Sequence, residues 1–133
     1  MSNTLTEAEV TFGVQNTINS YTQALDTGRT DDIVALFSKE GSSEIMGVGT
    51  FEGHDALRAA YAGMVPTQPQ RHMVGNVVIT SWTADEATAS SDLVFVLRGE
   101  TGWAVQLVGR YEDTLRRHGD AWLFQSRKLS LVM

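Results

Sequence analysis

The sequence predicts an α+β fold in which helices come first and a mainly antiparallel sheet follows. Near the N-terminus, apolar residues recur at intervals of three and four, which is the period of one helix face. From residue 71 onward, apolar and polar residues alternate as in strands, and short turn-like segments separate the alternating stretches. Strands joined in this way pair antiparallel, so the helices are expected to cover one face of a curved sheet.

A first helix is predicted to begin after Thr6 and to end near Asp26. Thr6 and Glu9 have the spacing of a capping box, and the apolar stripe that follows continues to Leu25. Gly28 is a typical stop signal, which places Asp26 in the last turn. Because the exposed carbonyl groups there disfavour a carboxylate, we expect a cationic group near Asp26.

Two shorter helices and a hairpin are predicted before the sheet. Residues 30–37 open with two acids where the helix dipole favours them, and residues 55–64 carry an apolar stripe that two prolines end. Residues 44–48 and 50–51 are predicted to form a weak hairpin around Gly47 and Gly49. The four predicted strands are residues 71–81, 87–98, 103–115 and 121–131.

Composition excludes several kinds of partner and site. A chain of 133 residues, 42% of them hydrophobic, is long enough for one domain, which we take to be 1–133. Ten basic and 16 acidic residues give a net charge of −6 without a basic run, so neither nucleic acid nor a membrane is an expected partner. The absence of cysteine excludes disulfides and thiolate metal sites. With no signal peptide or apolar spanning segment in the sequence, we expect a cytoplasmic protein.

The strand that opens at Arg71 carries a histidine at its start. Alternation places His72, Val74 and Asn76 on one face with Val78, and this face is otherwise apolar. A buried imidazole and a buried amide need hydrogen-bond partners. We therefore interpret this face as the lining of a pocket.

Several short motifs, in their order and spacing, resemble the SnoaL-like branch of the NTF2-like superfamily. They are residues 21–28 (YTQALDTG), 36–37 (LF), 51–54 (FEGH), 71–76 (RHMVGN), and 109–113 (GRYED) with Trp122 and Arg127. They extend over nearly the whole chain, although none is specific alone. The resemblance implies a cone-shaped barrel, with N-terminal helices packed on a curved sheet. The superfamily includes scytalone dehydratase, bile acid dehydratases and hexachlorocyclohexane dehydrochlorinase.

The resemblance also implies a catalytic dyad. In the lyases of this family, an aspartate at the end of the first helix pairs with a histidine that opens the strand after the third helix. Asp26 and His72 match these positions. The carboxylate would fix the imidazole tautomer, so that the neutral ring can take a proton from carbon. Periodicity alone places Asp26 about 100° from the centre of the helix stripe, so a surface aspartate beside an unrelated core histidine remains the alternative.

Tyr21 and Arg127 match further family positions. The resemblance implies that Tyr21 donates a hydrogen bond to a substrate oxygen and that Arg127 stabilises a leaving anion. Both have structural alternatives. A tyrosine in an apolar stripe, such as Tyr21, also fits a core position. Alternation groups Arg127 with Leu123 and Gln125 on one face, where it would need a buried ion-pair partner. The expected substrate contacts are Asn76, Met46, Met73 and Val94. For these the alternatives are a strand-to-strand hydrogen bond and core packing.

The resemblance, together with these residues, implies a cofactor-independent lyase or isomerase, such as a dehydratase, that acts on a small apolar or polycyclic molecule. No metal is expected, because His54, His72 and His118 lack a ligand spacing. The same fold also serves non-catalytic binding or assembly modules, and hydrolases or cyclases occur within the family, so these alternatives stay open. We expect a homodimer or homotrimer formed through an exposed sheet face, supplied by Trp103, Val105 and Leu107 or by their opposite-face neighbours.

Overall fold

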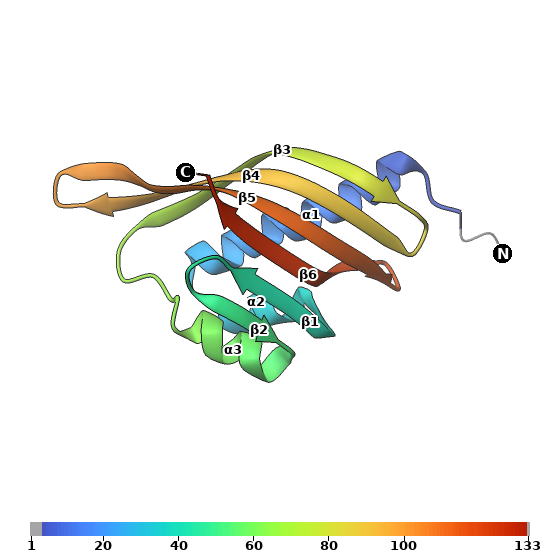
Figure 1. Cartoon of the computed structure of the whole chain (residues 1–133), viewed down its shortest axis with the longest axis horizontal. Helices are drawn as coiled ribbons and strands as arrows, with labels where there is room; N and C mark the ends of the chain where they lie inside the picture. The colour runs from blue at the N-terminus through green and yellow to red at the C-terminus, as the bar shows by residue number, and fades with distance from the viewer. Residues whose placement is uncertain (1–3, 133) are drawn as a thin grey trace.

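The computed structural model describes residues 4–132 as helices packed against one face of a curved sheet (Figure 1). The helices are α1 (Glu7–Asp26), α2 (Thr30–Ala35) and α3 (His54–Ala62). The strands are β1 (Phe37–Ile45), β2 (Gly49–Glu52), β3 (Gln70–Trp82), β4 (Glu86–Gly99), β5 (Gly102–His118) and β6 (Ala121–Leu131). Within the described residues, no helix is both long and apolar enough to cross a membrane.

The six strands form one sheet in the order β2-β1-β6-β5-β4-β3. Neighbouring strands are antiparallel except for β1 and β6, which are parallel. The predicted α+β fold with a mainly antiparallel sheet is therefore confirmed. The sheet is open rather than closed into a barrel, because β2 and β3 are its two edges and do not pair with each other.

Helix α1 follows its sequence signals closely. The Thr6 side chain accepts a hydrogen bond from the Glu9 backbone N–H at 3.1 Å, and the Glu9 carboxylate accepts one from the Thr6 N–H, so the capping box is formed. The predicted apolar stripe is buried against the sheet, and its residues are Val10, Val14, Ile18, Tyr21 and Leu25. The helix ends at Asp26, two residues before Gly28, whose φ of 70° is typical of a helix stop.

Strand β1 was not predicted at its full length. Helix α2 ends at Ala35, so Phe37 begins a strand instead of ending a helix. The predicted hairpin includes only the end of β1 and the short β2, which pair through Ser42 and Glu52 among others. The serines and glycine of β1 have low strand propensity, and its parallel pairing with β6 stabilises the strand through contacts far apart in the sequence.

Two β-bulges reverse the alternation on which the sequence prediction depended. In β3 the register with β4 shifts after Gly75, and Asn76 has a φ of 53°. Val77 and Ile79 then pack on the core, whereas Val78 is 55% exposed. In β6 the register shifts around Gln125, so the core-facing residues change phase between Phe124 and Arg127.

Candidate functional site

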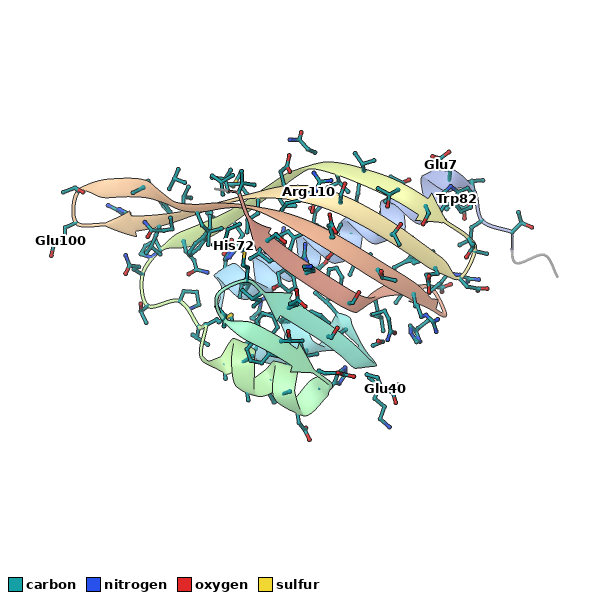
Figure 2. The ribbon with its side chains drawn as sticks, in the orientation of Figure 1. Glu7, Glu40, His72, Trp82, Glu100 and Arg110 are labelled. Atoms are coloured by element: carbon teal, nitrogen blue, oxygen red, sulfur yellow. The ribbon has the colours of Figure 1, made fainter. Side chains whose placement is uncertain are left out.

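A pocket of about 250 Å³ lies between the end of α1, strand β1 and the inner face of the sheet. Its apolar lining residues are Leu25, Ile45, Val48, Met64, Phe95, Leu107 and Leu129. Its polar lining residues are Tyr21, Ser43, Glu44, Gln70, His72, Tyr111 and Arg127. Figure 2 shows His72 in the middle of the molecule, far from the projecting β4–β5 turn marked by Glu100.

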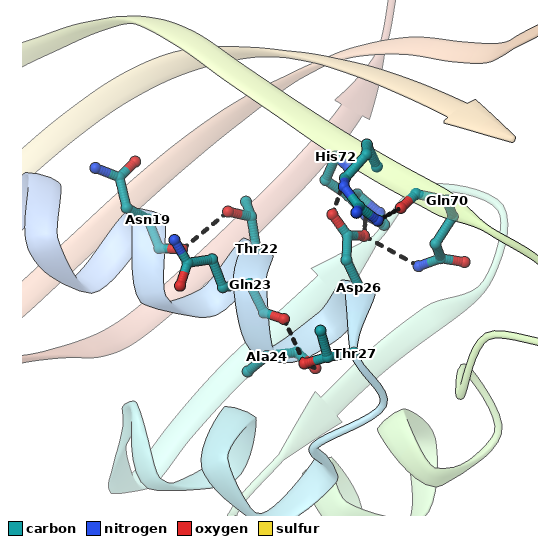
Figure 3. Close-up of polar contacts among 9 residues, drawn as sticks. Asn19, Thr22, Gln23, Ala24, Asp26, Thr27, Gln70 and His72 are labelled. Atoms are coloured by element: carbon teal, nitrogen blue, oxygen red, sulfur yellow. Dashed lines mark hydrogen bonds and ion pairs between the residues drawn. The ribbon is translucent and has the colours of Figure 1, made fainter. Parts of the chain in front are cut away.

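Asp26 contacts His72 from behind the pocket lining, to which His72 belongs and Asp26 does not (Figure 3). The His72 Nδ1 and Asp26 Oδ1 atoms are 2.6 Å apart, and the His72 backbone N–H donates to Asp26 Oδ2 at 2.8 Å. The Asp26 side chain is 7% exposed and that of His72 is 12% exposed, so this aspartate is not a surface residue. The structure therefore brings together the two residues of the expected dyad. The N–H groups of His72 and Gln70 stabilise the Asp26 carboxylate at the C-terminal end of α1, where a cationic group was expected.

The contact with Asp26 determines which tautomer the neutral His72 ring adopts. An ionised carboxylate only accepts hydrogen bonds, so Nδ1 carries the proton and Nε2 keeps its lone pair. Burial lowers the pKa of His72, and the charge of Arg127 also lowers it, whereas the hydrogen bond and charge of Asp26 raise it. Phe95 stacks on the ring with 4.3 Å between centroids. The lowered pKa of His72 favours the neutral form of the ring.

Gln70 is a third member of this cluster that the sequence analysis missed. Its Nε2 donates to Asp26 Oδ1 at 3.1 Å, and the residue is buried. The available signal was alternation, since Gln70 lies two residues before His72 on the same face. The predicted strand began at Arg71, whereas β3 begins at Gln70.

Tyr21 lines the pocket and also belongs to the core. Its hydroxyl is 2.7 Å from the Tyr61 hydroxyl, which is 2.8 Å from Ser43 Oγ. All three residues are buried. Burial raises the pKa of Tyr21 well above its ordinary value, so the phenol stays protonated and can act as a hydrogen-bond donor. The sequence analysis assigned no site role to Tyr61 or Ser43.

Arg127 forms the buried ion pair that was its structural alternative. Its Nε is 3.1 Å from Asp113 Oδ1, and both side chains are almost fully buried. This is an ionic contact and not an aligned hydrogen bond, because within the described residues none of these guanidinium nitrogens or carboxylate oxygens has a hydrogen-bond partner. The guanidinium carbon lies 3.5 Å from the centroid of the Tyr111 ring and 4.3 Å from that of Tyr21. Arg127 therefore reaches the pocket lining with its guanidinium packed against the rings of Tyr21 and Tyr111.

Asn76 lies outside the pocket, in contrast to its expected role as a substrate contact. The bulge in β3 turns it to the surface, where its Nδ2 donates to Asp92 Oδ2 at 2.7 Å. This is the strand-to-strand hydrogen bond that was its alternative.

Met46, Met73 and Val94 are also absent from the pocket lining. Met46 follows the end of β1 and is 52% exposed. Met73 is 60% exposed because it is next to His72 and alternation turns it to the outer face of the sheet. Val94 pairs with Met73 across the two strands and lies on that outer face, whereas its neighbour Phe95 lines the pocket.

The other two histidines are separate from the site. His54 Nε2 lies 2.9 Å from the Phe37 carbonyl oxygen, and His118 is at the end of β5. In the part of the chain that the structure describes, no three His, Cys, Asp or Glu side chains come together as possible metal ligands.

Comparisons with known proteins agree with this architecture. Among solved structures, a proposed scytalone dehydratase from Novosphingobium aromaticivorans DSM 12444 is similar, with 23% identity, a TM-score of 0.82, and coverage of 92% of this chain and 84% of that chain. An NTF2-like protein with a cystatin-like fold from Novosphingobium aromaticivorans has 21% identity and a TM-score of 0.85, and the match covers 94% of this chain and 83% of that chain. LinA has 15% identity and a TM-score of 0.81, and the match covers 95% of this chain and 88% of the LinA chain.

These identities are low, so the structural likeness shows a shared fold. No curated protein sequence matches the chain. A family model described as the SnoaL-like domain matches residues 6–128, which is nearly the whole chain. The protein therefore belongs to the SnoaL-like domain family, within the NTF2-like fold.

Proposed function

We propose that this protein is a cofactor-independent lyase or isomerase, of the dehydratase type, in which His72 takes a proton from a carbon atom of a small, largely apolar molecule. The observation that carries the proposal is the partly buried imidazole at the pocket, held through Nδ1 by the Asp26 carboxylate. This arrangement leaves Nε2 as the base. General bases are most effective when they are neutral and positioned within hydrogen-bond reach of the proton they remove.

The two residues of the dyad have complementary roles in this proposal. When His72 Nε2 accepts the proton, the ring becomes a cation, and the Asp26 carboxylate 2.6 Å from Nδ1 stabilises it. The electron pair of the broken C–H bond can pass to an adjacent carbonyl group, and the resulting enolate then takes the proton back from the His72 imidazolium at a different carbon. Alternatively, the pair expels hydroxide from the neighbouring carbon, and this hydroxide takes the same proton and leaves as water. The first path leads to isomerisation and the second to dehydration.

Tyr21 and Arg127 would act on the negative charge that develops on the substrate. Tyr21 lines the pocket as a protonated phenol and would donate to the developing oxyanion. Because the Arg127 guanidinium is packed against the rings of Tyr21 and Tyr111 and is paired with Asp113, we assign it an electrostatic role at the pocket. Apolar residues elsewhere in the lining would bind the hydrocarbon body of the substrate.

The experiment is a hydrogen-exchange assay in D2O with a panel of small cyclic ketones and β-hydroxy ketones. Proton NMR would follow the loss of carbon-bound proton signals and the appearance of alkene signals. We expect His72→Gln to lower the rate by about 10² to 10⁴, the usual contribution of a general base. His118→Gln, which changes a histidine remote from the pocket, should leave the rate unchanged.

Retention of the rate within a few-fold in His72→Gln would remove His72 from the mechanism. Binding of panel members, seen as shifts of pocket resonances, without exchange or elimination would favour the non-catalytic binding module.

A further inference from the structure

We infer that Gln70 is a positioning residue of the dyad, which holds the Asp26 carboxylate through a hydrogen bond to the same oxygen that contacts the His72 ring. The inference rests on the proposed function, because it assigns Gln70 a role through His72. It extends that function by adding a residue that touches neither the proton nor the base.

The contacts of the Asp26 carboxylate support this role. Oδ1 contacts both His72 Nδ1 at 2.6 Å and Gln70 Nε2 at 3.1 Å, while Oδ2 accepts the His72 backbone N–H at 2.8 Å. All of these donors come from the first three residues of β3, so one strand end fixes the carboxylate (Figure 3). Rotation of the Asp26 side chain would break several hydrogen bonds at once.

The orientation of the Gln70 amide follows from the chemistry of its partner. Because an ionised carboxylate has no hydrogen to donate, the NH₂ group must face Asp26 and the amide oxygen must face away. The backbone of Gln70 is fixed as well, since it pairs with Leu97 and its carbonyl accepts from Arg71 Nη1 at 2.6 Å. Gln70 is therefore pre-organised as a donor.

This donor has a predictable effect on His72. It draws negative charge at Oδ1 away from the ring and so weakens the stabilisation of the imidazolium form by Asp26. Without the Gln70 amide, the carboxylate should hold the imidazolium more strongly, and the pKa of His72 should rise. The other titratable groups that line the pocket are Tyr21 from α1, Glu44 from β1, Tyr111 from β5 and Arg127 from β6. Neither Glu44 nor Arg127 has a hydrogen bond to the Gln70 amide in the described structure.

The test is an NMR titration of the histidine ring nitrogens in the full-length protein, which needs no substrate. Gln70→Met keeps an unbranched side chain of similar length and removes the donor. We expect the pKa of His72 to rise by about half a unit to one unit, with the proton of the neutral ring still on Nδ1. Gln68→Met is the matched control, because the Gln68 amide donates to the Arg98 carbonyl at 2.8 Å outside the pocket. This control should leave the pKa of His72 unchanged.

A second variant covers the case in which Gln70→Met does not fold. Gln70→Leu removes the donor with a branched apolar side chain, and it should raise the pKa of His72 by an amount similar to that of the methionine. A folded variant of either kind with the pKa of wild-type protein would overturn the role of Gln70.

Asp26→Asn separates this inference from the proposed function. If Asp26→Asn leaves the pKa of His72 unchanged, the dyad itself fails and the proposed function fails with it. If Asp26→Asn lowers the pKa while the Gln70 variants do not change it, the dyad stands and only the role of Gln70 is wrong.

Discussion

Tyr61 is the residue whose replacement tests the hydroxyl chain beneath the pocket. Its hydroxyl lies 2.7 Å from that of Tyr21 and 2.8 Å from Ser43 Oγ, and all three groups are buried. Tyr61→Phe keeps the ring, so it opens no large cavity, but it removes both hydrogen bonds. At about 1 kcal/mol for each bond, the free energy of unfolding should fall by about 2 kcal/mol. For a domain of this size, the Tm should fall by roughly 6–10 °C.

Urea unfolding followed by tryptophan fluorescence would measure this change. The slope of the free energy against urea should be unaltered, because the same surface is exposed on unfolding. Tyr111→Phe is the matched control, because Tyr111 is also a buried tyrosine but its hydroxyl has no hydrogen bond within the described residues. This substitution should lower the free energy of unfolding by less than about 0.5 kcal/mol. Equal losses in the two variants would show that the hydroxyl chain does not stabilise the fold.

Three further predictions concern the ion pair and the bulge. Arg127→Met should lower the free energy of unfolding by about 3–5 kcal/mol because it leaves the Asp113 carboxylate buried without a counter-charge, and Arg127→Met with Asp113→Leu should recover much of this loss in denaturation experiments. Burial raises the pKa of Asp113 from 3.8 to about 6 despite the opposing charge of Arg127, so the folded state holds a proton that the unfolded state has lost. Between those pH values wild-type stability should therefore fall as pH rises, by at most about 3 kcal/mol, and Asp113→Asn should flatten this part of the profile. Asn76→Val should cost about 1–2 kcal/mol because a β-branched residue resists the φ of 53°, whereas Asn76→Gly should stay within about 0.5 kcal/mol, as thermal unfolding would show.

Elements with strong local signals were predictable from the sequence. The capping box and stripe of α1 depend on residues within one or two turns, and the structure reproduces both. Strand β6 also has the predicted bounds, 121–131. Most of β1 was missed because its stability comes from β6, more than 80 residues later in the sequence, and its own composition does not indicate a strand.

The candidate site shows the same division between local and distant causes. His72 was singled out by alternation, and Asp26 by the resemblance, although helix periodicity placed it at the edge of the stripe. Asn76 was misplaced by a single bulged residue, because one inserted position moves the following side chains to the opposite face. Gln70 was missed because the predicted start of the strand was one residue late.

The bulge at Asn76 also affects how the molecule behaves toward other copies of itself. Strand β3 is an edge of the open sheet and is 13 residues long, and an unprotected edge of that length is a template onto which another chain can add a strand. The left-handed turn of the backbone at Asn76 breaks this edge into two shorter stretches and twists them relative to each other. The bulge therefore limits the risk of aggregation that an open sheet edge brings.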